Sequence, residues 1–97
     1  MIKNQDLIDR FFRYVKIDTQ SAEDTGTQPS TAKQHDLAKL LHKELHEMGV
    51  ETHYDRKNCY VYAKLPGEEP AIGFVAHMDT SPDASGENVQ AKTVLYE

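Results

Sequence analysis

The sequence contains a single cysteine, Cys59, which excludes a disulfide within the chain. It also lacks any apolar run near the roughly 20 residues that a membrane-spanning helix requires. The first six residues lead directly into an amphipathic pattern, without the apolar segment of a signal peptide. These absences predict a protein of the reducing cytoplasm with no membrane partner.

Basic charge is scarce as well, with 11 Lys and Arg against 16 Asp and Glu and a formal net charge of −5 at pH 7. The basic residues are interspersed with acidic ones, so the sequence offers no positive stripe for a phosphate backbone. We therefore expect no nucleic-acid partner. The 38% hydrophobic and 28% charged residues, over a length of 97, are typical of one small globular domain.

Two segments have the periodicity of amphipathic helices. Apolar residues recur every three to four positions from 5 to 16, which predicts the first helix, and a polar loop with Gly and Pro follows. The second helix is expected from Thr31 to Met48, because Thr31 and Gln34 match a capping box. Gly49 is placed to end it in the left-handed conformation. The expected buried stripe consists of Leu37, Leu40, Leu41, Leu45 and Met48.

Beyond the second helix the pattern changes to that of strands. Residues 50–54 and 59–65 alternate and are separated by a turn, which predicts a β-hairpin. Residues 71–76 form a continuous apolar run of strand length, which predicts a strand buried on both faces. The expected fold class is α/β: two amphipathic helices, a hairpin and a buried strand.

A candidate site follows the predicted buried strand. In open α/β sheets, functional groups gather just past the carboxyl ends of such strands, where His77 stands. If the chain stays extended, His77 and Asp79 lie on the same side, and the carboxylate can accept the imidazole's second N–H. The other ring nitrogen would then be free for a metal. The structural alternative is that His77 merely ends a strand and Asp79 starts a turn.

Longer motifs around these residues resemble the peptidase T family of dinuclear zinc aminoacylase and carboxypeptidase-like peptidases. The segment from Gly73 to Asp83, followed by Gly86 and Asn88-Val89, is similar to the family's first metal motif. Earlier segments are similar to the family in the same order and at similar spacing. They are Arg10 to Val15, Asp18 to Ser21, Pro29 to Thr31, and Leu41 to Gly49. The resemblance covers nearly all of the chain.

The resemblance implies that residues 1–97 are the amino-terminal portion of a three-layer zinc-peptidase catalytic domain. His77 would ligate one of two zinc ions, and Asp79 would orient the site beside it. The bridging aspartate, the Glu-Glu pair with the general base, and the remaining ligands would come from downstream sequence, so the 97-residue chain alone is expected to be inactive. The implied reaction is release of the amino-terminal residue from tripeptides, and assembly into a homo-oligomer is left open.

Other interpretations of the sequence remain open. The chain could be a standalone, non-catalytic α/β binding module, or a fragment of a dinuclear metal phosphoesterase. The phosphoesterase is disfavoured because no Gly-rich phosphate loop is present. His42 and His46 have the spacing of a helical zinc motif, but Lys43 occupies the position of its glutamate base. With His35, they are expected to form a solvated helix face.

Overall fold

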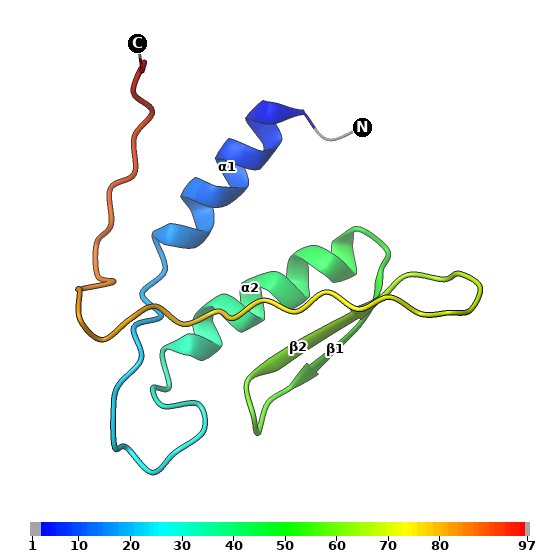
Figure 1. The fold of residues 1–97 in the computed structure, drawn as a ribbon, viewed down its shortest axis with the longest axis horizontal. Coiled ribbons are helices and arrows are strands. Elements are labelled where there is room, and N and C mark those ends of the chain that lie inside the picture. Colours follow the sequence, from blue (N-terminus) through cyan, green and yellow to red (C-terminus); the bar gives the residue numbers. More distant parts are fainter. Residues whose placement is uncertain (1–2, 97) are drawn as a thin grey trace.

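The computed structural model describes residues 3–96 and has a mixed helix-and-strand architecture, which confirms the expected class (Figure 1). Along the chain come α1 (Asn4–Val15), α2 (Gln34–Glu47), β1 (Glu51–Asp55) and β2 (Tyr60–Lys64). β1 and β2 form an antiparallel hairpin in which Glu51 pairs with Lys64 and Asp55 with Tyr60. Both predicted helices and the predicted hairpin are therefore present. Within this part of the chain, neither helix is long and apolar enough to cross a membrane.

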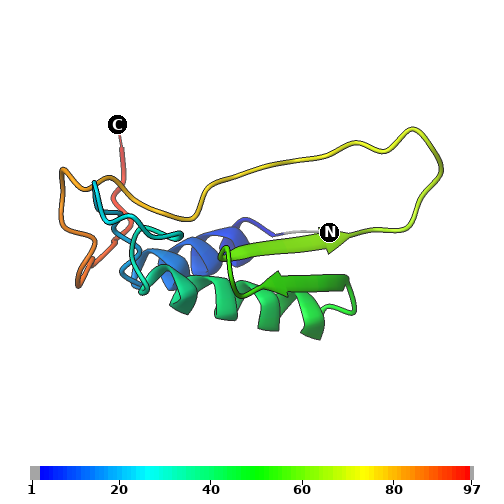
Figure 2. The same ribbon diagram turned by 90° about the horizontal axis from the view of Figure 1, so that it is seen from below.

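Helix α2 packs along one face of the hairpin (Figure 2). Ala38 of α2 is fully buried against Tyr54 of β1 and Cys59, which precedes β2, and Val61 and Met78 pack around this small core. Burial raises the pKa of the Cys59 thiol, which makes this residue a packing group rather than a thiolate nucleophile.

The ends of α2 follow the sequence only in part. Gly49 has a φ of +79°, as expected for a left-handed residue after a helix. The helix begins at Gln34, however, and the predicted capping box at Thr31 is wrong. The Thr31 hydroxyl donates instead to the backbone carbonyl of Gln20, at 2.8 Å, and Gln34 Nε2 donates to Thr31 Oγ1. The Thr31 side chain thus makes a tertiary contact with Gln20 instead of the local capping box.

Helix α1 is held to α2 by hydrogen bonds to one carboxylate. No residue of α1 is buried. Glu44, whose side chain is 13% exposed, accepts a hydrogen bond from Arg13 Nε at 2.7 Å and another from the Tyr14 hydroxyl. Partial burial opposes ionisation of Glu44, but the bonds from Arg13 and Tyr14 outweigh it and hold its pKa below the ordinary 4.5. Glu44 is therefore the principal link between the two helices.

Replacing Glu44 with alanine should loosen α1. Hydrogen bonds to charged groups contribute about 1.5–3 kcal/mol, so we expect the opening free energy of α1 to fall by about that amount. Because the pKa of Glu44 is lowered in the folded protein, its contribution is present above pH 4.5 and is lost as the pH falls below that value. The measurement is amide hydrogen exchange of α1 in wild type and Glu44→Ala, above and below this pH.

Glu47→Ala is the matched control. Glu47 lies on the same helix but is exposed, and its contact with Lys43 is at 4.0 Å. Such a surface pair is worth at most about 1 kcal/mol. Equal acceleration of α1 exchange in the two variants would contradict the assignment of Glu44 as the link.

The predicted buried strand at 71–76 is not formed. The segment is extended but has no strand beside it in the described residues, and it arches away from the hairpin (Figure 2). Phe74 and Val75 are 96% and 100% exposed. The expectation was wrong because an apolar composition favours burial, whereas a strand also needs a neighbour with which to exchange backbone hydrogen bonds.

This exposed segment should cause the 97-residue chain to self-associate. Ile72, Phe74 and Val75 place large apolar side chains in solvent on an unpaired extended backbone, which is a typical surface for intermolecular contact. We expect light scattering to give a mass above that of the monomer, rising with concentration. The double substitution Phe74→Asp and Val75→Asp should lower that mass. A concentration-independent monomer in both forms would contradict the prediction.

Candidate metal centre

His77 and Asp79 form the contact that their spacing predicts. His77 Nδ1 lies 3.0 Å from Asp79 Oδ1 and 2.8 Å from the Asp79 backbone oxygen. Both oxygens can only accept, so Nδ1 carries the proton and donates it. In the neutral ring the lone pair of His77 therefore lies on Nε2, and the side chain is 84% exposed. An oriented imidazole with a free Nε2 is the usual arrangement of a metal-binding histidine.

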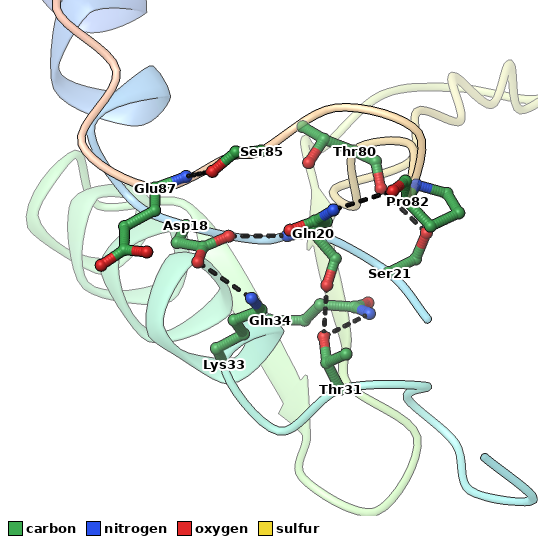
Figure 3. Close-up of polar contacts among 10 residues, drawn as sticks. All are labelled: Asp18, Gln20, Ser21, Thr31, Lys33, Gln34, Thr80, Pro82, Ser85 and Glu87. Atoms are coloured by element: carbon green, nitrogen blue, oxygen red, sulfur yellow. Dashed lines mark hydrogen bonds and ion pairs between the residues drawn. The ribbon is translucent and has the colours of Figure 1, made fainter. Parts of the chain in front are cut away.

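The backbone next to this pair is fixed by a segment nearly 60 residues away in the sequence. Thr80 N donates to the carbonyl of Thr19 at 3.1 Å, and Ser21 N donates to the carbonyl of Thr80 at 2.9 Å. These two bonds make a parallel bridge between Gln20 and Thr80. Figure 3 shows Thr80 beside Gln20 and Ser21. From the sequence, the segment around Thr19 is expected to be a loop. The only sign of its importance is that Asp18 to Ser21 resembles a segment of the peptidase T family.

The described residues fit one position of a zinc shell. Neutral imidazole nitrogen is a common zinc ligand, and structural or catalytic zinc takes three or four protein ligands. Within residues 3–96, no three His, Cys, Asp or Glu side chains converge as a metal site. The Asp79 carboxylate is engaged by His77 Nδ1. A zinc site that used His77 would therefore need further ligands from outside residues 3–96.

The histidines of α2 have a different role from the one expected. The prediction of a solvated face is wrong for His35 and His42, which are half-buried against Tyr54 of β1. His35 Nδ1 hydrogen-bonds the Tyr54 hydroxyl, and the ring of His42 lies 6.0 Å from that of Tyr54. Only His46 is exposed. The reason is that β1 lies along this face of α2, so these side chains belong to the helix–hairpin interface.

An open groove lies beside the candidate ligand. Its volume is about 770 Å³, and it is bounded by α2, the hairpin and residues 74–79, including His77 and Asp79. Leu41, Leu45 and Val61 give it apolar walls. Ligand sites are concave spaces of about 300–1,000 Å³ with mostly apolar linings, so the groove has the dimensions of a small-molecule site.

The sequence of the chain is similar to those of known proteins. No family model matches the chain. Peptidase T of Desulfitobacterium hafniense (strain Y51) is 54% identical over 92 residues, which cover 91% of this chain and 22% of that protein. The chain is homologous to peptidase T. Peptidase T of Parabacteroides distasonis is 51% identical over 94 residues, covering 93% of the chain and 23% of the relative.

A third example, peptidase T of Alkaliphilus oremlandii, is 47% identical over 96 residues, covering 93% of the chain and 24% of the relative. The chain thus spans less than a quarter of the length of these peptidase T relatives. A match that covers so much of the 97 residues necessarily includes the segment with His77 and Asp79.

Proposed function

We propose that the chain is the amino-terminal part of a cytoplasmic, zinc-dependent aminopeptidase that releases the first residue of tripeptides. The observation that carries the proposal is the oriented His77 with a free Nε2, in a chain about half identical to peptidase T. His77 is proposed as a ligand of one of two zinc ions. Asp79 is proposed as the residue that orients this ligand.

A zinc ion held by His77 and ligands from elsewhere would supply Lewis-acid chemistry for the scissile carbonyl and for an attacking water. The contribution of this chain is to present the ligand. Asp79 fixes the tautomer by accepting the Nδ1 proton, and the carboxylate makes Nε2 a better donor to the metal. The general base and the other ligands are proposed to come from residues other than 3–96, which bring no further His, Cys, Asp or Glu to the site.

Substrate binding is proposed for the groove beside His77. Its volume of about 770 Å³ suits a short peptide, and its apolar walls offer contacts for side chains of differing shape. The similarity to peptidase T, rather than the groove, favours a peptidase over a non-catalytic binding module.

The test is an assay of the full-length protein on tripeptides. We expect cleavage that is lost with a chelator and restored by zinc, and release of the first amino acid alone. A tripeptide with an acetylated amino terminus is the control and should not be cleaved. Chelator-insensitive turnover, or no turnover after zinc is restored, would contradict the proposal.

A further inference from the structure

We propose that Asp18 and Gly86 are positioning residues for the His77 ligand, acting through Thr80. The inference rests on the proposed zinc-peptidase function and concerns the junction of residues 18–21 with residues 80–86, named here the clasp. His77 is largely exposed, and within residues 3–96 its ring hydrogen-bonds only to Asp79. Its location in space must therefore be set by the backbone beside it.

One side of the clasp is a set of hydrogen bonds to the residue after Asp79. The carbonyl of Thr80 accepts from Ser21 N at 2.9 Å and from Ser21 Oγ at 2.8 Å, while Thr80 N donates to Thr19 O. Thr19 is only 2% exposed, whereas Thr80 is exposed, so the clasp joins a buried residue to a surface segment. Farther along, Gln20 Nε2 donates to the carbonyl of Pro82 at 3.0 Å (Figure 3).

The other side of the clasp is a close approach at Gly86. Gly86 is buried, and a Cβ built on it would lie 2.9 Å from Asp18 Oδ1 and 3.2 Å from Thr80 Oγ1. Real Cβ atoms essentially never come within 3.0 Å of a neighbouring heavy atom. Gly86 is not in the left-handed region, so the restriction on this position is one of space and not of backbone conformation.

The carboxylate that Gly86 meets cannot easily move aside. Asp18 Oδ1 accepts from Gln20 N at 3.0 Å, and Oδ2 accepts from Lys33 Nζ at 2.9 Å (Figure 3). The bond from Lys33, together with that from Gln20, lowers the pKa of Asp18 and keeps it ionised. A Cβ at position 86 would therefore push the segment from Thr80 to Gly86 away from residues 18–20.

Together these contacts hold both ends of the loop that follows His77 and Asp79. Both ends of the segment from Thr80 to Gly86 rest on residues 18–20, and within it Asp83 N donates to Ser81 Oγ. Thr80 is bonded to Asp79 through one peptide unit, so a shift of Thr80 also moves Asp79. Because Asp79 accepts the hydrogen bond from His77 Nδ1, the imidazole moves with it. Ligand geometry depends on such supporting contacts, and their loss typically costs about 10–100-fold in metal affinity or activity.

The experiment compares Gly86→Ala with Gly67→Ala in the full-length protein, because a Cβ at Gly67 meets nothing within 4 Å. Zinc affinity is measured by competition with a chromogenic chelator, and amide exchange of Ser21 and Thr80 is measured in metal-free protein. We expect Gly86→Ala to weaken zinc binding by about 10–100-fold and to speed exchange at both amides. Gly67→Ala should match wild type in both measurements.

A second pair of variants guards against misfolding of Gly86→Ala. Asp18→Ala removes the carboxylate, whereas Asp18→Asn keeps an oxygen for Gln20 N and gives up only the partly exposed pair with Lys33. Zinc affinity should fall in the first variant and return towards wild type in the second. Equal zinc affinity and equal exchange for Gly86→Ala and Gly67→Ala, in a wild-type protein that does bind zinc, would overturn the inference. Failure of wild type to bind zinc would instead overturn the proposed function.

Discussion

His77→Ala is expected to remove zinc-dependent cleavage of tripeptides by the full-length protein. The substitution deletes the Nε2 that the proposal assigns to the metal, and the ring is too exposed for its loss to leave a cavity. The reduction in kcat/KM should exceed the roughly 10–100-fold that follows loss of a residue merely supporting a ligand. Zinc content after dialysis and kcat/KM on a tripeptide are the two measurements.

His46→Ala is the control for that experiment. His46 is exposed on α2, whereas His42 packs against Tyr54 and its loss would disturb the helix–hairpin interface. We expect His46→Ala to retain the zinc content and activity of wild type. Equal losses in His46→Ala and His77→Ala would show that His77 has no special relation to the metal.

Asp79→Ala should lower zinc affinity and kcat/KM by about 10–100-fold, less than the loss in His77→Ala. The substitution leaves Nε2 in place but removes one of the two oxygens that accept the Nδ1 proton. Asp79→Asn keeps a carbonyl oxygen at this position without the charge, so its zinc affinity should lie between those of Asp79→Ala and wild type. Chelator competition and steady-state kinetics measure both effects.

Asp83→Ala serves as the matched control, because Asp83 is an exposed aspartate of the same loop and hydrogen-bonds to Ser81 through its backbone amide. It should behave as wild type. Zinc affinity of Asp79→Ala equal to that of Asp83→Ala would mean that the Asp79 carboxylate does not support the ligand.

Local sequence patterns predict the elements whose residues contact near neighbours. The periodicity of 5–16 locates α1 to within a residue, and the turn after Asp55 marks the hairpin because Asp55 Oδ1 accepts from the amides of Lys57 and Asn58. The left-handed conformation of Gly49 is also predictable, because the left-handed residue that ends a helix is usually glycine. The contact between His77 and Asp79 is also local, being two residues apart.

Features that depend on distant partners escape such patterns. The sequence around Thr31 matches a helix capping box, but the Thr31 hydroxyl donates its hydrogen bond to the Gln20 carbonyl. The apolar run 71–76 reads as a strand, yet pairing depends on a neighbour that residues 3–96 do not provide. The bridge between Gln20 and Thr80 joins segments far apart in the chain, and neither segment alone signals the other. Burial of His35 and His42 likewise depends on where β1 lies.

The most direct measurement of the central claim is anomalous diffraction at the zinc edge from crystals of the zinc-loaded, full-length protein. The account predicts a zinc ion about 2.0–2.1 Å from His77 Nε2, with Nδ1 still directed at Asp79. An ordered zinc site that excludes His77, or one that binds it through Nδ1, would contradict the account.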